Sequence, residues 1–368
     1  MLQRLSGDPL QAERWCHQLA EAAEATRVLL LLAGTATAAV PGISAAGATP
    51  ESRRLTAAAD AELLLLGPAQ KRPHALPPLP AGVSPALIAR VVVEQLGLDP
   101  LVVDAGAAVP PAVPHLQLGQ GPARCLSGGD AMELQRVRRL LALGRRWGRQ
   151  LARLRQPLLV AECVPGGTST AQAVLQGLGV EAAGLVSGSL REPAHALKAA
   201  LVARGLAAAQ LPSPASAEAV LAALGDPMQP LAAGLVQAAA LDGLPVLLAG
   251  GSQMAAVLAL ALELTAAQDR ARLTAHAALA TTAWVAAEPS SNLTVLLENL
   301  GRRWCVEPLA FAAGLRFSRC RSAELLAFEQ GYVKEGVGAG GLAALWQLSG
   351  RSLDDLAEAC DQACAQLL

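Results

Sequence analysis

The sequence predicts an α/β fold in which a largely parallel β-sheet is covered by helices on both faces. Two observations support this prediction. Short apolar runs without polar alternation recur along the chain, and the Ala- and Leu-rich segments between them have the length and composition of helices. Strands buried on both faces read as continuous apolar runs, and strands that alternate with helices form parallel sheets. We therefore expect a Rossmann-like arrangement with ligands bound beyond the carboxyl ends of the strands.

Four apolar runs predict individual strands. They are residues 27–32 (RVLLLL), 101–103 (LVV), 158–160 (LLV) and 244–248 (LPVLL). Each run is followed by a turn that contains glycine, which allows the chain to reverse tightly into the next helix. Residues 73–83 and 105–122 are rich in Pro and Gly and predict loops within the fold rather than domain linkers.

Composition excludes several classes of protein. The chain has 368 residues, of which 53% are apolar and 16% are charged, so it can bury a large core and is not disordered. This length favours two domains, or one large α/β domain with an appendage. The net charge is −1 and aromatic residues make up 2% of the chain, which argues against a nucleic-acid partner.

The sequence also predicts a cytoplasmic protein without membrane spans. Seven cysteines are scattered without a CxxC pair, which indicates reduced thiols and neither disulfides nor a structural metal. Residues 1–14 lack an apolar core typical of signal peptides. The two most apolar stretches, residues 28–48 and 244–264, are interrupted by Pro, Gly and polar residues and are not clean spans of about 20 apolar residues.

The most informative motif is LLVAECVPGGTSTAQAVLQG at residues 158–177. A strand ends at Glu162, and a double glycine then leads into hydroxyl-bearing residues that open an Ala-rich helix. Free N–H groups and hydroxyls at a helix N-terminus bind anions such as phosphate, and Glu162 can accept hydrogen bonds from a ribose. The alternative is an ordinary helix cap that binds nothing. The candidate phosphate-binding residues are Gly166, Gly167, Thr168, Ser169 and Thr170.

Two further glycine motifs carry weaker signals. Gly250, Gly251 and Ser252 follow a predicted strand, where tight helix packing explains the glycines as well as ligand binding does. YVKEGVGAGG at residues 332–341 formally contains G-x-G-x-x-G, but neither a buried strand before it nor a second strand after it is present, so a dinucleotide site is excluded. Glu335 in this motif is a candidate general base, and a solvated surface carboxylate is the alternative.

These motifs together resemble the nicotinate-nucleotide:dimethylbenzimidazole phosphoribosyltransferase family, and in particular its archaeal and cyanobacterial branch. The resemblance rests on the order AECVPGGTSTAQA, GDP at residues 225–227, LPVLLAGGSQM, AAEPSSNLTVLL at residues 286–297 and VKEGVGAGG. It implies transfer of the 5-phosphoribosyl group from nicotinate mononucleotide to a lower-ligand base in cobalamin biosynthesis, giving an α-riboside phosphate and nicotinate. It further implies a homodimer that needs no cofactor and no metal.

The resemblance also implies roles for individual residues. Glu335 is similar to the catalytic Glu of the family's LGEGTGA run, with Gly336 and Gly338 beside it, and Glu162 is similar to the Glu before the family's phosphate turn. Lys198 is similar to a lysine that follows this turn. The family's GRGTG run reads VSGSL here at residues 186–190, and PGISAAGATPESRRLTAAADAE at residues 41–62 has no close match in the better-known bacterial members.

The implied domain organisation is an α/β domain at residues 25–300 and a small helical domain at residues 1–24 and 301–368. An amphipathic stripe supports packing of the C-terminal helices against an N-terminal helix near residues 8–25. Its members are Leu342, Leu345, Trp346, Leu353, Leu356 and Cys360. Two other functions stay open: a nucleotide or cobamide-precursor binding protein without catalysis, and another nucleotide-dependent transferase or hydrolase.

Overall fold

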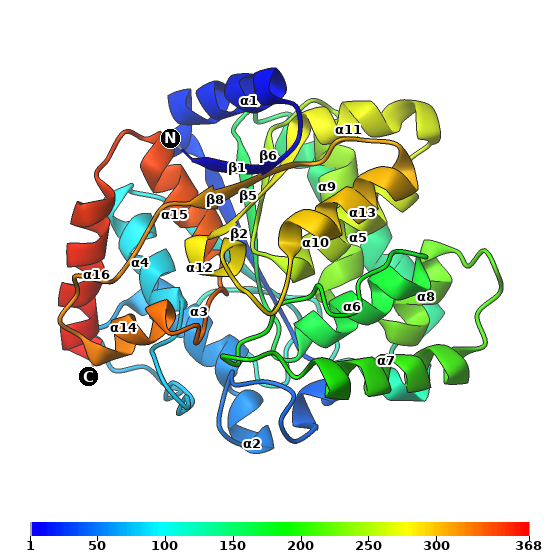
Figure 1. Ribbon diagram of the computed structural model, residues 1–368, viewed down its shortest axis with the longest axis horizontal. Helices are drawn as coiled ribbons and strands as arrows, with labels where there is room; N and C mark the ends of the chain where they lie inside the picture. The colour runs from blue at the N-terminus through cyan, green and yellow to red at the C-terminus, as the bar shows by residue number, and fades with distance from the viewer. Residues whose placement is uncertain (1, 368) are drawn as a thin grey trace.

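The computed structural model describes residues 2–367 and is built around an eight-stranded sheet in the order β1-β8-β7-β6-β5-β2-β3-β4 (Figure 1). Strand β1 runs antiparallel to β8, and all other neighbouring pairs are parallel. The predicted α/β fold is therefore confirmed. The strands are β1 (Gln3–Ser6), β2 (Arg27–Ala33), β3 (Pro100–Gly106), β4 (Leu116–Gln117), β5 (Leu158–Cys163), β6 (Val246–Ala249), β7 (Ala277–Thr282) and β8 (Leu309–Ala313).

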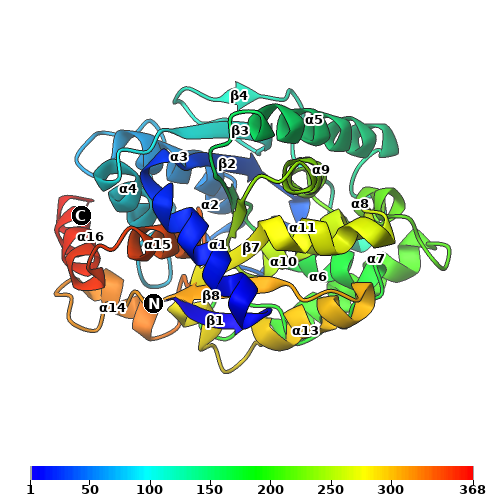
Figure 2. The same ribbon diagram turned by 90° about the horizontal axis from the view of Figure 1, so that it is seen from above.

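Helices cover both faces of this sheet, as Figure 2 shows from above. One face carries α1 (Pro9–Glu21), α3 (Thr56–Leu66), α4 (Ala86–Gln95), α14 (Ala323–Glu329), α15 (Ala339–Leu348) and α16 (Leu353–Leu367). The other face carries α5 (Leu134–Ala152), α6 (Gly167–Gly177), α7 (His195–Ala209), α8 (Ala217–Leu224), α9 (Met228–Leu241), α10 (Ser252–Glu263), α11 (Arg270–His276) and α13 (Leu293–Trp304). Short helical turns are α2 (Pro50–Arg53), α12 (Ala283–Ala286) and the 3₁₀ segments Ala23–Ala25, Ala36–Ala39, Leu126–Gly128 and Ala267–Asp269.

Burial on both faces explains why the strands lack polar alternation. In β2, Leu29 and Leu31 pack into the core on the side of α9, whereas Leu30 and Leu32 pack into the core on the side of α4. Successive side chains of a strand point to opposite faces, so a strand with a core on each face needs apolar residues at every position. Residues 28–33 of β2 (VLLLLA) satisfy this requirement, and Arg27 at the start of the strand is exposed.

The four predicted strands correspond to β2, β3, β5 and β6. Strand β6 begins at Val246 rather than Leu244, since Pro245 has no backbone N–H to donate to a neighbour. Strands β7 (AALATT) and β8 (LAFAA) were not predicted. Their alanines favour helices in isolation, and the sheet context overrides this local preference.

The two chain ends lie on the same side of the molecule (Figure 1). Helix α15 packs against α1, as predicted, while α16 packs against α4 and α14. Arg351 pairs with Glu24 at 2.9 Å and adds an exposed link between the ends. In the predicted stripe, Leu353 is half-buried and the other five side chains are buried.

The division into two domains stays a prediction. Two strands within the predicted helical segments, β1 and β8, belong to the central sheet and tie these segments to it. The terminal residues Met1 and Leu368 of that predicted domain lie outside the described residues.

Candidate active site

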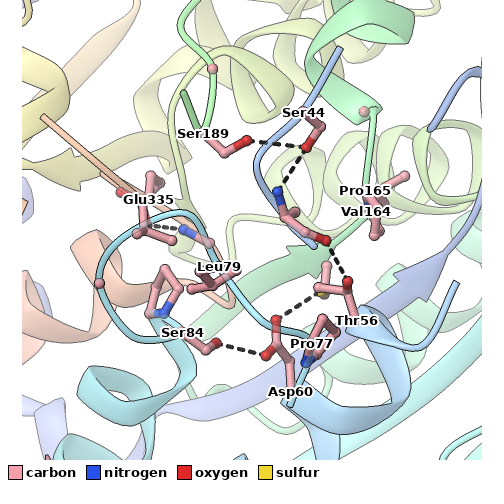
Figure 3. A pocket seen from close by; sticks show the side chains of 18 of the residues that line it. Ser44, Thr56, Asp60, Pro77, Leu79, Ser84, Val164, Pro165, Ser189 and Glu335 are labelled. Carbon is pink, nitrogen blue, oxygen red and sulfur yellow. Dashed lines mark hydrogen bonds between the residues drawn. The ribbon is translucent and has the colours of Figure 1, made fainter. Parts of the chain in front are cut away.

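A cavity of about 460 Å³ opens beyond the carboxyl ends of β5 and β6 (Figure 3). This volume is in the range of small-molecule sites. The turn before α6 forms one side of the cavity, and α3 with the loop before α4 forms another. Glu162 and Glu335 both line it, so the structure brings the two predicted carboxylates to one site.

The turn between β5 and α6 presents a helix N-terminus to this cavity. Gly166 has a φ of 79°, a left-handed conformation that favours glycine, and no side chain caps α6. A Cβ atom on Gly167 would overlap the side chain of Gln253. Gly166, Gly167 and Thr168 line the cavity, which leaves backbone and hydroxyl groups facing the space where an anion would bind.

The other two predicted hydroxyls point into the protein. Thr170 is fully buried and donates a hydrogen bond to Asp226 at 2.6 Å. Ser169 is also fully buried, and its hydroxyl has no hydrogen-bond partner in the described structure. Thr170 therefore anchors the turn, while Thr168 is the hydroxyl of this group that faces the cavity.

A second helix N-terminus lies beside the first. Gly250 and Gly251 follow β6 and lead into α10, which also begins without a side-chain cap. Gly251, Ser252 and Gln253 line the cavity, and the Ser252 hydroxyl accepts a hydrogen bond from the backbone N–H of Ser187 at 3.0 Å. The positive ends of α6 and α10 thus meet at one edge of the sheet, where they favour a bound anion.

Glu162 lies at the end of β5 with an exposed fraction of 5%. Its Oε1 atom accepts a hydrogen bond from the amide of Gln253 at 2.8 Å, whereas Oε2 has no partner in the described structure. Burial raises the pKa of Glu162 to about 8, and the nearby Asp226 and Glu335 raise it as well. Glu162 lines the cavity, and its Oε2 is a buried polar atom that a bound ligand could pair with.

Glu335 is held in place by four hydrogen bonds. Its Oε1 accepts from the backbone N–H groups of Gly336 at 3.1 Å and Gly340 at 3.0 Å. Its Oε2 accepts from the Thr281 hydroxyl at 2.9 Å and the Thr282 N–H at 3.0 Å. Burial raises the pKa of Glu335, and these four donors act against that rise.

The glycines around Glu335 pack α15 against the sheet. A Cβ atom on Gly338 would lie 2.7 Å from the Cβ of Ala161 in β5, and one on Gly341 would overlap Ala249 in β6. The backbone N–H of Val337 also donates to the carbonyl of Glu162 at 3.0 Å. Gly338 and Gly341 therefore allow α15 to lie close to the sheet.

Lys198 lies behind the cavity wall rather than on it. It is 1% exposed, and its Nζ donates to the carbonyl of Ser187 at 2.6 Å. A buried pair lies nearby: Lys334 contacts Glu288 at 2.8 Å, and Lys334 also donates to the carbonyl of Leu190. The two lysines therefore fix residues 187–191, of which Ser187, Gly188 and Ser189 line the cavity. Burial lowers the pKa of Lys198 to about 8.

Several residues at the site were not predicted. Asp60 on α3 and Ser84 before α4 line the cavity, and Asp226 lies buried against Thr170 in the first turn of α6. Asp226 lies in the GDP segment and Glu288 in AAEPSSN. Both segments belong to the resemblance, but no role was predicted for either residue. Asp60 lies in an alanine-rich helix, where no local pattern distinguishes it from a surface residue.

The raised pKa of Glu162 predicts a pH-dependent contribution to stability. The native site holds its proton up to about pH 8, whereas the unfolded chain releases it near pH 4.5, so the free energy of unfolding falls as pH rises between these values. Glu162→Gln removes this contribution. The melting temperature of the variant should therefore rise relative to wild type from pH 5 to pH 8. If the difference in melting temperature between Glu162→Gln and wild type stays constant from pH 5 to pH 8, the raised pKa of Glu162 is contradicted.

Comparison with known proteins places this geometry in a family. A family model described as phosphoribosyltransferase matches residues 86–288, more than half of the chain. The chain belongs to this phosphoribosyltransferase family. It is 51% identical to a UPF0284 protein of Prochlorococcus marinus (strain MIT 9313), over 97% of this chain and 90% of that protein. It is also 51% identical to a UPF0284 protein of Parasynechococcus marenigrum (strain WH8102), over 99% and 93%. The resemblance to the family and its branch is confirmed.

Solved structures of this phosphoribosyltransferase fold are similar to the chain over nearly its whole length. The structure of CobT from Thermus thermophilus matches with a TM-score of 0.58 and 20% identity over 95% of each chain. A structure described as nicotinate-nucleotide-dimethylbenzimidazole phosphoribosyltransferase from the same organism matches with a TM-score of 0.58 and 20% identity over 96% of each chain. At this identity the likeness establishes the fold.

Within residues 2–367, no helix has the length and apolar character needed to cross a membrane. The same residues contain no group of three or more His, Cys, Asp or Glu side chains arranged to hold a metal ion. The predictions of a homodimer, a cytoplasmic location and a reaction without metal or cofactor stay predictions.

Proposed function

We propose that this phosphoribosyltransferase moves the 5-phosphoribosyl group of nicotinate mononucleotide to a nitrogen of an aromatic base in cobamide synthesis. The observation that carries the proposal is the meeting of Glu162, Glu335 and the uncapped turn of α6 in one cavity. The name of one solved structure with this fold, a nicotinate-nucleotide-dimethylbenzimidazole phosphoribosyltransferase, supports the choice of donor and acceptor. The products are nicotinate and an α-riboside phosphate.

The phosphate of the donor binds at the N-termini of α6 and α10. Backbone N–H groups and the Thr168 hydroxyl face this position, and the helix dipoles favour a dianion there. Glu162, which is protonated at neutral pH, donates a hydrogen bond from Oε2 to a ribose hydroxyl oxygen, which gives this buried oxygen the partner it otherwise lacks. Together these contacts hold C1′ of the ribose inside the cavity.

The reaction is a displacement at C1′. A ring nitrogen of the acceptor base attacks C1′ from the face opposite nicotinate, and the bond from C1′ to the pyridinium nitrogen breaks. The electron pair of that bond goes to the pyridine nitrogen, so nicotinate leaves as a neutral ring. Attack by the unprotonated ring nitrogen leaves the heterocycle positively charged, and its ring N–H then loses the proton to the Glu335 carboxylate, which acts as general base. Enclosure of the ribose excludes water from the developing cation.

Glu335 suits this role because its position is fixed before the acceptor arrives. Four hydrogen bonds fix both carboxylate oxygens, and one of these bonds is released when the carboxylate takes the proton. Burial keeps its pKa above the ordinary value, which brings its proton affinity closer to that of the acceptor nitrogen. The fixed carboxylate positions the acceptor base and the bound nucleotide positions C1′, so the two reactants meet in the geometry needed for attack.

Nicotinate release from nicotinate mononucleotide, measured with and without an acceptor base, separates this function from its rivals. The transferase releases nicotinate when base and nucleotide are both present. A simple nucleosidase releases it at the same rate without base. A binding protein retains the nucleotide and releases none under either condition, and either of these two results would contradict the proposal.

A further inference from the structure

Asp60 is a buried carboxyl in the cavity wall that the reaction described above does not use. It lies on α3 with an exposed fraction of 4%, and it lines the cavity together with Ser84 and Cys163. Figure 3 shows its carboxyl beside Ser84, on a different element from Glu335. A ring bound in the cavity therefore meets one carboxyl near α15 and another on α3.

The hydrogen bonds of Asp60 leave it as an acceptor for a ligand. The Ser84 hydroxyl donates to Oδ1 at 2.6 Å, and the Cys163 thiol donates to Oδ2 at a sulfur–oxygen distance of 3.4 Å. Both partners are neutral, and each carboxylate oxygen retains a second lone pair. Burial raises the pKa of Asp60 to about 6, so the carboxyl is mostly ionised at neutral pH. A buried anion gains most from a further hydrogen-bond donor.

The surroundings of Asp60 have the shape and chemistry of a site for a flat ring. Apolar side chains form the adjacent wall of the cavity. They are Leu76, Pro77, Leu79, Val83, Pro85 and Val333. The wall is tightly packed, because a Cβ atom on Gly82 would lie 2.8 Å from a methyl group of Val333. An apolar wall that carries one buried carboxylate selects a heterocycle by the polar groups on its edge.

We infer that Asp60 determines acceptor specificity and selects a fused nitrogen heterocycle that presents an N–H or amino donor on its edge. This inference rests on the proposed function, because it assigns the ring that attacks C1′ to this wall. An amino-substituted purine-type base satisfies Asp60, while its attacking nitrogen faces Glu335. A ring with methyl groups on that edge, such as 5,6-dimethylbenzimidazole, leaves the buried carboxylate without a new partner. A phenol also has no second hydrogen-bond donor to present to the Asp60 carboxylate.

The test measures equilibrium binding of matched bases by calorimetry on the full-length protein. Adenine and purine differ by one amino group, and a hydrogen bond to a charged acceptor changes affinity by about 10- to 100-fold. We expect wild type to bind adenine at least about tenfold more tightly than purine, and more tightly than 5,6-dimethylbenzimidazole. Asp60→Asn keeps the side-chain volume and should reduce the adenine preference to less than about threefold. Asp130→Asn, an exposed aspartate on the surface, should leave it unchanged.

Equal binding of adenine and purine by wild type overturns the inference, and so does an adenine preference that survives intact in Asp60→Asn. If Asp60→Asn does not fold, the comparison of ligands on wild type decides alone. Binding needs no turnover, so a correct adenine preference without release of nicotinate would contradict the proposed function and leave the assignment of Asp60 standing.

Discussion

Replacing Glu335 with glutamine should lower turnover by about two to four powers of ten while nucleotide affinity stays close to wild type. Glutamine has nearly the same shape but cannot take a proton from the acceptor nitrogen. The amide also places an NH₂ group where one oxygen accepts two hydrogen bonds, so the backbone donors on that side, Gly336 and Gly340 or Thr282, lose their acceptor. Steady-state kinetics with saturating donor and base measure the effect.

A matched control and a pH profile make this result specific. Glu298→Gln changes an exposed glutamate on α13 and should keep wild-type turnover. In wild type, turnover should rise with pH through the raised pKa of Glu335, because the base acts only when ionised. Glu335→Gln should lose this acidic limb. Turnover near the wild-type level in Glu335→Gln would rule out its role as general base.

A single methyl group at Gly340 should reduce both stability and activity. In Gly340→Ala the new Cβ would overlap the backbone of Thr281 and Thr282 and the carboxyl of Glu335. Backbone cannot move aside as a flexible side chain can, so we expect a cost of about 1–3 kcal/mol in the free energy of unfolding. Displacement of Glu335 should lower turnover further, even in the fraction that is folded.

Gly121→Ala is the control for this experiment. A Cβ atom there meets nothing within 4 Å, so the melting temperature and turnover should match wild type. Thermal unfolding and steady-state kinetics of the two variants decide the comparison. If Gly340→Ala behaves like Gly121→Ala, the close approach of α15 to β7 is not what positions Glu335.

The sequence predicted the centre of the sheet well because its strands are buried on both faces. Strands β2 and β5 each consist largely of branched apolar residues that fit a pleated, fully covered position. Strands β7 and β8 contain many alanines, and local composition does not separate such strands from helices. Small residues in β5 and β6 have a packing reason, because Ala161 and Ala249 lie where the glycines at the start of α15 approach the sheet closely.

The candidate site was predictable where residues follow strands. Glu162, Thr168 and Ser252 all lie at or after the ends of parallel strands, whose carboxyl ends meet at one edge, and the structure places them in one cavity. Glu335 does not follow a predicted strand, so the local pattern made it only a candidate general base. The resemblance supplied its catalytic role. Asp60 could not be found, because it reaches the cavity from the middle of a helix and its partners Ser84 and Cys163 are distant in sequence.

The central claim is tested most directly by identifying the product formed from nicotinate mononucleotide and a panel of aromatic bases. Mass spectrometry should detect a base-riboside phosphate together with one equivalent of nicotinate, and NMR should show the α configuration expected of a single displacement at C1′. Formation of ribose 5-phosphate alone with every base, or the absence of any new product, would contradict phosphoribosyl transfer to a base.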